Sequence, residues 1–186
     1  MHLGALVAQR LLTMKLHGKK CILRAVEPHD VSHFFRWEND TENWLVSGTV
    51  APFSRHDLER YVRGIRDIYS DKQLRLVIAT DEGPIGSIDL FDFEPLHRRA
   101  GIGILIGEPE ARQQGLAADA LQVVIDYGFE TLQLHQLYAN IPANNSASIA
   151  LFEHAGFECV GTRKDWLSSP SGYIDEYMYQ RIQAVK

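Results

Sequence analysis

Residues 112–117 read Arg-Gln-Gln-Gly-Leu-Ala, and they follow an apolar run at residues 100–107, Ala-Gly-Ile-Gly-Ile-Leu-Ile-Gly. The run predicts a strand, and an amphipathic helix is predicted from the turn to about Glu130. A tight turn leading directly into a helix gathers unpaired backbone N–H groups at the positive end of the helix dipole. Such a turn can bind phosphate, because Gly115 allows close approach and Arg112 adds charge. Taken alone, the stretch also fits an ordinary strand–turn–helix connection, since many helices begin near a glycine.

A second segment, residues 145–157, reads Asn-Ser-Ala-Ser-Ile-Ala-Leu-Phe-Glu-His-Ala-Gly-Phe. It begins with a residue favoured at helix N-caps and ends with a glycine favoured after helix C-termini. Together the two segments resemble the GNAT superfamily of acyl-CoA-dependent N-acetyltransferases. Its phosphate loop, R/Q-x-x-G-x-G/A, is matched by Arg112, Gly115 and Ala117. Its downstream pattern, N-x-x-S/A-x-x-x-Y/F-x-x-x-G-F, is matched by Asn145, Ser148, Phe152, Gly156 and Phe157.

The resemblance is closest to the branch of ribosomal-protein alanine acetyltransferases and spermidine acetyltransferases, where stretches like His97–Ala100 and Asp126–Phe129 recur. It extends over roughly residues 16–181. It implies an α+β GNAT fold, with a mixed, mainly antiparallel central sheet flanked by helices. It also implies transfer of an acetyl group from acetyl-CoA, the cosubstrate, to a primary amine. That amine belongs either to a small amine or polyamine or to a protein N-terminus.

The resemblance further implies which residues bind acetyl-CoA. The pyrophosphate is expected at the backbone N–H groups of the phosphate loop, namely Ala111, Arg112, Gln113, Gln114, Gly115, Leu116 and Ala117. The pantetheine is expected to pair with the end of the preceding strand, Gly103, Ile104, Leu105 and Ile106, and to contact Asn145, Ser148 and Phe152. Backbone donors at that strand end can polarise the thioester carbonyl. The glycines of this strand mark either a groove for a ligand or a bulge and crowded packing.

The chain of 186 residues is long enough for one domain with a substantial core. We expect a single acetyltransferase domain at residues 14–186, preceded by an N-terminal extension at residues 1–13. That extension lacks the basic start and cleavage site of a signal peptide. No run approaches the ~20 apolar residues that a membrane-spanning helix needs, so no membrane partner is expected.

Charge and cysteine content narrow the partners further. The net charge of −5 argues against a nucleic-acid partner, which requires a basic surface, and suits a cationic substrate. The eight histidines show no metal-ligand spacing, so we expect no metal. Cys21 and Cys159 are expected to be reduced packing residues, as in a cytoplasmic protein. The resembling branch often forms dimers, which makes a homodimer plausible.

Hydrophobic periodicity and turn residues predict the remaining elements. Strands are expected at residues 22–25, 74–80, 85–93, 97–106 and 136–140. Helices are expected at residues 31–38, 55–69 and 145–156. A final hairpin is expected from strands at 158–166 and 173–181, and residues 39–54 are expected to form a polar loop.

The attacking amine must be neutral, which calls for a nearby base or for groups that manage its charge. Asp89 and Asp92 lie on the strand before the expected pantetheine strand, with Glu94 just beyond them. Period-two alternation places Asp89 with Phe91 on one face and Asp92 on the other, so one of the two aspartates faces the acceptor. Asp92 is assigned to attracting the amine, while the base stays open. Glu38 is a further candidate for recognising a cation.

The departing thiolate reveals a difference from the family. Many members have a tyrosine where this chain has Phe152, and phenylalanine has no proton to donate. Either backbone donors and water assist the thiolate, or Tyr138, Tyr173 or Ser148 takes that role. This difference keeps one alternative open, a non-catalytic acyl-CoA-binding or sensing module.

Aromatic residues flank the expected polar loop. Trp37, Trp44 and Phe53 are candidates for the substrate pocket, because aromatic rings attract ammonium groups. The alternative is that these rings only anchor the loop to the core.

Overall fold

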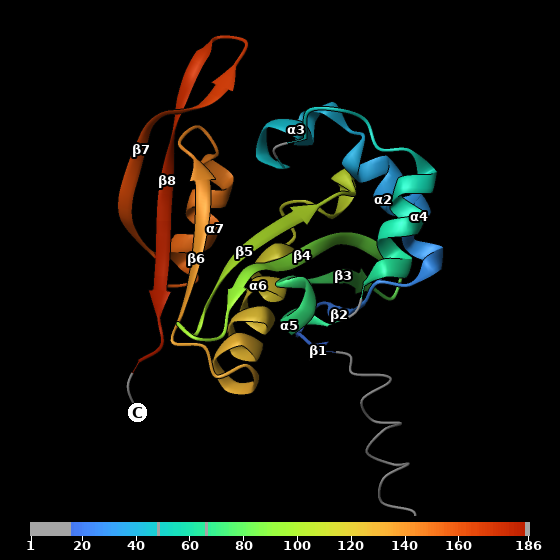
Figure 1. Cartoon of the computed structure of the whole chain (residues 1–186), viewed down its shortest axis with the longest axis horizontal. Helices are drawn as coiled ribbons and strands as arrows, with labels where there is room; N and C mark the ends of the chain where they lie inside the picture. The colour runs from blue at the N-terminus through green and yellow to red at the C-terminus, as the bar shows by residue number, and fades with distance from the viewer. Residues whose placement is uncertain (1–15, 48, 66, 185–186) are drawn as a thin grey trace, which may run out of the picture.

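The computed structural model describes residues 16–184 except residues 48 and 66, so the expected extension at residues 1–13 lies outside the described residues. Within this part, an eight-stranded sheet has the order β1-β2-β3-β4-β5-β6-β8-β7 (Figure 1). Neighbouring strands are antiparallel except β5 and β6, which are parallel. The mixed, mainly antiparallel sheet is therefore confirmed. The strands are β1 Leu16–His17, β2 Ile22–Ala25, β3 Leu74–Thr80, β4 Gly83–Glu94, β5 Arg99–Ile106, β6 Gln136–Pro142, β7 Glu158–Ser169 and β8 Gly172–Ile182.

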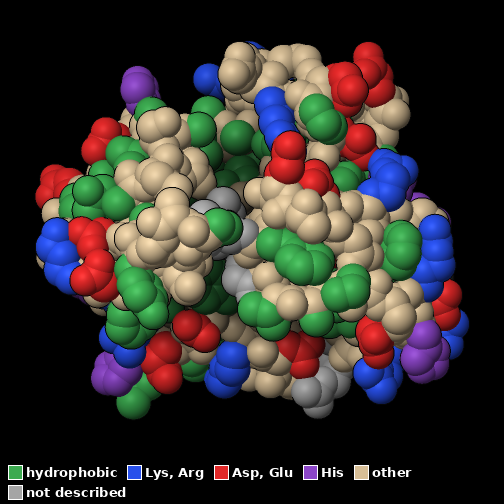
Figure 2. Space-filling model, turned by 90° about the horizontal axis from the view of Figure 1, so that it is seen from above, with side chains coloured by type: hydrophobic (Ala, Val, Ile, Leu, Met, Phe, Trp, Pro, Cys, Tyr) green, Lys and Arg blue, Asp and Glu red, His purple; other side chains and the backbone are tan. Residues whose placement is uncertain are grey.

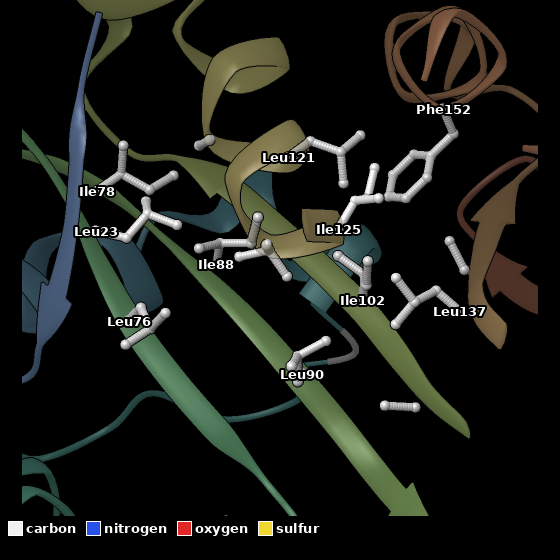
Figure 3. Close-up of a cluster of buried hydrophobic side chains, with 14 of the residues drawn as sticks. Leu23, Leu76, Ile78, Ile88, Leu90, Ile102, Leu121, Ile125, Leu137 and Phe152 are labelled. Carbon is white, nitrogen blue, oxygen red and sulfur yellow. The ribbon is translucent and has the colours of Figure 1, made fainter. Parts of the chain in front are cut away.

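Helices cover both faces of the sheet. The described helices are α2 Val31–Glu38, α3 Thr41–Ser47, α4 Arg55–Gly64, α5 Ile68–Asp71, α6 Leu116–Asp126 and α7 Ser146–His154, with a π turn at Tyr127–Thr131. One core lies between the sheet and α6, where Leu121 and Ile125 pack near Ile88 and Ile102 (Figure 3). A second core lies on the opposite face, where Phe34 of α2 and other residues of α2 and α4 pack against β3.

Strand alternation on β3 explains the two cores. Leu76 and Ile78 belong to the core under α6, whereas Val77 and Ala79 belong to the core under α2 and α4. Successive side chains of a strand point to opposite faces, so the continuous apolar run of β3 fills both layers.

The predicted elements at residues 22–25, 31–38 and 74–80 are confirmed at their bounds. Two expectations were wrong. The loop predicted at residues 39–54 contains helix α3. The helix predicted at residues 55–69 is two helices, because α4 ends at Gly64, a poor helix former, and Ile65 is extended. Asp67 then starts α5 by accepting hydrogen bonds from the backbone N–H groups of Tyr69 and Ser70.

Strands β5 and β6 begin side by side and then separate (Figure 1). They are paired through three residue pairs, Arg99–Gly101 with Gln136–Tyr138. Beyond them, β5 remains paired with β4 and β6 remains paired with β8. The parts of β5 and β6 beyond Gly101 and Tyr138, called the two arms below, therefore keep one hydrogen-bonded neighbour each. The edges of the two arms that face one another are unpaired.

Strand β4 is irregular near its end. Its register with β5 shifts between Phe91 and Glu94, and Asp92 has a φ of 48°. A bulge inserts an extra residue and turns the following side chains. Strict alternation along β4 therefore ends at Phe91.

Candidate active site

A groove of about 660 Å³ opens between the separated strands β5 and β6. On the β5 side the groove is lined by Ile102, Gly103, Ile104 and Leu105, and on the β6 side it is lined by residues 139–142. Helices α4 and α7 and the β7–β8 hairpin contribute further walls. Figure 2 shows the surface hollowed near the centre of the view, between two bulkier parts of the molecule. The unpaired edges of two strands thus face one ligand-sized opening.

Alternation decides which side chains face the groove from β6. Leu137, Ala139 and Ile141 are buried in the core under α6. Tyr138 and Asn140 therefore point to the opposite face. On β4, Ile88 and Leu90 face the same core, which leaves Asp89 on the groove side.

The phosphate loop has the geometry expected of an anion-binding turn. Gly115 is the N-cap of α6 with a φ of 77°, a conformation that favours glycine. Arg112, Gln113 and Gln114 are exposed around it. Arg112 donates from Nε to the Ile106 carbonyl at 3.2 Å, which ties the loop to the end of β5. The remaining expected loop residues are the buried Leu116 and the half-buried Ala111 and Ala117.

Lys20 adds a cation that sequence reasoning missed. Its Nζ lies 2.8 Å from the Gln114 carbonyl and 2.9 Å from where a Cβ on Gly115 would be. The carboxylate of Asp119 fixes this lysine's position by accepting from the backbone N–H groups of Lys19, Lys20 and Cys21. The adjacent lysines before β2 are the signal in the sequence, but their approach to α6 is a long-range contact.

The expected pantetheine residues are brought together with one exception. Gly103, Ile104, Leu105, Asn145, Ser148 and Phe152 all line the groove, and Ile106 is not among its lining residues. Asn145 caps α7, because its Oδ1 accepts from the Ser148 backbone N–H at 3.0 Å. Phe152 is 3% exposed and contacts Phe157 edge to face, with its ring directed toward Ile125 (Figure 3).

Arg75 holds the acidic side of the groove together. It donates from Nε to Asp89 at 2.6 Å and from Nη1 to Glu38 at 3.0 Å. Gln73 also donates to Asp89, at 3.0 Å. Burial disfavours the charged guanidinium, but Asp89 and Glu38 outweigh that effect and raise the pKa of Arg75. Sequence reasoning missed Arg75, whose position two residues into a strand carries no motif.

Neither Asp92 nor Tyr138 is among the residues that line the groove. The Tyr138 hydroxyl donates to Asp92 Oδ2 at 3.1 Å, beside the point where β5 and β6 separate. Burial and the Asp92 carboxylate raise the pKa of Tyr138 to about 12. The expectation that Asp92 faces away from Asp89 was wrong, because the bulge in β4 turns Asp92 back toward Tyr138, on the groove side of the sheet.

The aromatic candidates separate into two groups. Phe53 lines the groove. Trp37 is 2% exposed in the core under α2, and its Nε1 donates to Glu108 at 3.0 Å, so it lies outside the groove lining. Trp44 also lies outside the lining, and its Nε1 donates to the Glu38 carbonyl at 3.0 Å. Trp37 therefore belongs to the core and bonds Glu108, whereas Trp44 bonds the backbone at the end of α2.

The candidate proton donors are also dispersed. Ser148 lies in the groove, Tyr138 lies at its closed end, and Tyr173 is 70% exposed on the β7–β8 hairpin. Among the described residues, three or more His, Cys, Asp or Glu side chains nowhere gather closely enough to hold a metal ion. In the same part of the chain, no helix is long and apolar enough to cross a membrane.

The sheet opens between its two parallel neighbours, beside a helix that begins at a glycine, and this arrangement leaves room for an extended ligand that carries phosphate groups. Residues 20–158 match the family described as "Acetyltransferase (GNAT) domain", and the chain belongs to that family. It is an acetyl-CoA-dependent N-acetyltransferase that acts on an amine.

Relatives and solved structures agree with this assignment. The chain is 32% identical to the spermidine N(1)-acetyltransferase of Escherichia coli (strain K12), over 75% of this chain and 73% of that protein. It is 27% identical to an N-acetyltransferase 9-like protein of Caenorhabditis briggsae, over 79% of each chain. Its fold matches a spermidine N-acetyltransferase from Vibrio cholerae in complex with CoA and spermine, with a TM-score of 0.81 and 24% identity, covering 88% of this chain and 96% of that one.

Proposed function

We propose that the protein acetylates a small cationic primary amine of the polyamine class. The observation that carries this proposal is the charge of the groove. Four carboxylates line it, those of Glu38, Asp57, Asp89 and Glu176. Within the described residues three arginines pair with them, Arg75 with Glu38 and Asp89, Arg60 with Asp57, and Arg163 with Glu176, which leaves one negative charge in excess. An acidic groove concentrates a cationic acceptor beside the reacting thioester. The similarity to a spermidine N(1)-acetyltransferase supports the same class.

The phosphate loop and the edge of β5 are proposed to hold acetyl-CoA. Gly115 presents the first turn of α6 without a Cβ, and Lys20 supplies a nearby cation. Gly103 leaves open space on the groove side of β5, since the nearest atom to a Cβ built there is a Phe91 ring carbon at 3.8 Å. These features fit an elongated, polyanionic thioester.

Asp89 and Glu38 are proposed to attract the ammonium group, after which the proton leaves through groove water. Both carboxylates already share Arg75, which fixes their positions. Tyr138 remains the proposed proton donor to the thiolate, because its phenol lies at the closed end of the groove; its pKa of about 12 keeps it protonated at neutral pH but makes it a weaker acid than an ordinary tyrosine. The acidic partner Asp92 holds its hydroxyl in place.

The cellular setting belongs to the same proposal. We place residues 14–186 in one domain that works in the cytoplasm, where Cys21 and Cys159, both free thiols, stay reduced. A homodimer is proposed from the resembling branch. Light scattering coupled to gel filtration tests the homodimer, and a monomeric mass at working concentration would contradict it.

A thiol-release assay over an amine panel tests the substrate class. The panel contains spermidine, a diamine, a neutral monoamine and a peptide with a free N-terminal alanine. We expect the highest kcat/KM for the polyamine and a decrease in it with added salt, because exposed charges are screened. A higher kcat/KM for the peptide would contradict the polyamine class. Calorimetric binding of acetyl-CoA without turnover on any amine would point instead to a binding module.

A further inference from the structure

Asn140 lies in the open part of the groove without an assigned role. It follows Tyr138 by two residues on β6, just past the point where β5 and β6 separate. Its neighbours Ala139 and Ile141 are buried in the core, so its side chain faces the groove, which it lines. Its position places a carboxamide at the unpaired edge where a ligand enters.

The carboxamide oxygen of Asn140 has no hydrogen-bond partner within the described residues and is shielded from solvent. Other asparagines are anchored: Asn145 accepts from Ser148, Asn39 bonds Phe35 and Phe53, and Asn43 bonds Trp37 and Asp40. A buried acceptor without a partner costs about 1–3 kcal/mol. Such a group in a native structure calls for an explanation, and a bound ligand or water is among the usual ones.

The opposite arm leaves space in front of Asn140. Gly101 pairs with Tyr138, so continuing the parallel register by two residues places Gly103 opposite Asn140. Gly103 has no side chain, and it pairs on its other side with Asp89. The open space between Asn140 and Gly103 is therefore bordered by the carboxylate proposed to attract the amine.

We propose that Asn140 binds the reacting nitrogen of the acceptor, accepting a hydrogen bond from one N–H of the neutral amine. The proposal rests on the proposed amine acetylation. A half turn about the Cβ–Cγ bond, a broad torsion, brings the oxygen into the groove. The oxygen gives up no hydrogen bond in that turn, and the amide NH₂ takes its former place. A neutral carboxamide orients the amine without stabilising the unreactive ammonium form.

The balance of the reaction accounts for both N–H groups. The amine nitrogen bonds to the acetyl carbon, and the carbon–sulfur bond breaks. One proton leaves the nitrogen through groove water, and the departing thiolate takes up one proton. The other N–H stays on the amide product, still hydrogen-bonded to Asn140.

The test compares Asn140→Leu with Asn144→Leu on the best amine of the panel. Leucine has nearly the same shape and no acceptor. We expect Asn140→Leu to lower kcat/KM for the amine at least tenfold, with unchanged affinity for acetyl-CoA. Its Tm should equal or exceed that of the native protein, because the unpaired oxygen is gone. Asn144 is exposed and outside the groove lining, so its variant should behave as the native protein does.

Asn140→Asp provides a second, independent measurement. It keeps an acceptor oxygen but adds a charge that favours the ammonium form, so the rate–pH profile should move to higher pH. Native amine kinetics in Asn140→Leu, or an unmoved profile in Asn140→Asp, would overturn the proposal. Weaker acetyl-CoA binding with an unchanged amine KM would overturn it too, by assigning Asn140 to the cosubstrate. A native enzyme that acetylates no amine contradicts the proposed function instead.

Discussion

Arg75 makes Asp89 and Glu38 a single unit at the acidic side of the groove. Its side chain is 21% exposed, so the ion pairs are mostly withdrawn from water. A guanidinium in that position depends on both carboxylates, because an uncompensated buried charge is costly. Asp89 therefore balances the charge of Arg75, whereas Asp92, the other aspartate of β4, accepts a hydrogen bond from Tyr138.

Asp89→Asn should lower the free energy of unfolding by about 1.5–3 kcal/mol, the usual contribution of a hydrogen bond to a charged group. It should also raise the amine KM, because the groove loses an attracting charge. Asp92 is exposed, so Asp92→Asn should stay within ~0.5 kcal/mol of the native protein. Urea denaturation and steady-state kinetics measure both. A loss of turnover of about 10²-fold in Asp89→Asn, at unchanged KM, would identify Asp89 as a general base.

Phe152→Tyr tests whether a phenol in the groove wall helps the thiolate. We expect retained acetyl-CoA affinity and higher turnover, at a cost of about 1–3 kcal/mol in unfolding free energy for a hydroxyl in a packed site. Phe157→Tyr is the matched control, since that ring is equally buried but does not line the groove. It should lose similar stability with unchanged turnover. Lost acetyl-CoA binding in Phe152→Tyr would show that the ring is packed too tightly.

The sequence predicted which residues lie at the groove better than it predicted the directions in which their side chains point. Asp89, Phe53 and Ser148 line the groove as the patterns indicated. Asp92 turned the other way because a bulge, which has no sequence motif here, breaks the alternation of β4. Trp37 is buried in the core under α2, a position fixed by contacts distant in sequence.

At the scale of elements, the phosphate loop depends on the backbone of Gly115. Gly115→Val forces a β-branched residue into a φ of 77° and brings its Cβ to 2.9 Å from Lys20 Nζ. We expect the Kd for acetyl-CoA to rise at least tenfold, or about 1.4 kcal/mol. Calorimetry on the folded variant measures it, and unchanged affinity would remove the phosphate-loop assignment.

Gly172→Val is the matched control for that variant. Gly172 is the first residue of β8, directly after the turn from β7, with a φ of 124° and open space around it. The backbone strain is of the same kind, but the phosphate loop is untouched. Its stability should fall while acetyl-CoA affinity stays native.

The elements that the sequence predicted best are those with strong local signals. Helix α2 follows Pro28 and Asp30, which set its start, and β3 is a continuous apolar run. Helix α3 was missed, because the polar, glycine- and proline-containing composition of residues 39–54 resembles that of a loop. Its contacts with α2 arise only in the folded chain, where Trp44 bonds the Glu38 carbonyl.

At the scale of the whole molecule, the buried thiol of Cys21 links stability to pH. Burial, reinforced by a hydrogen bond to Asp119, raises the pKa of Cys21 from 9.0 to about 12. A group with a raised folded pKa stabilises the fold fully below its unfolded pKa and loses that contribution as pH rises through the folded value. We therefore expect the free energy of unfolding to fall between pH 9 and pH 12. Tyr138, also raised to about 12, acts in the same direction.

Urea unfolding at a series of pH values measures this loss. The expectation that Cys159 is a packing residue was wrong, because it is exposed on β7, and Cys159→Ser is therefore a control that should keep the native pH dependence. At pH 8, iodoacetamide should modify Cys159 in the folded protein and spare Cys21 until the chain unfolds. Rapid modification of Cys21 in the folded state would contradict its burial.

Two short motifs were enough to predict the architecture, since together they identify the two helices beside the opening. The groove itself could not be predicted in detail. Its acidic side depends on Arg75, and its phosphate loop gains Lys20, which lies 94 residues from Gln114. Such long-range contacts leave no periodic signal in the sequence.

Because β5 and β6 are paired over only three residue pairs, a small change in the angle between them has its largest effect at the open end of the groove. Pro142 lies four residues beyond Tyr138, and a strand rises about 3.3 Å per residue, so it lies about 13 Å from the last paired position. A rotation of about 10° between the two arms would change the width there by about 2 Å, while hardly moving Gly101 and Tyr138. A change of that size is comparable to a methylene or two of acyl chain. The angle between the two strands therefore sets the width of the open end of the groove.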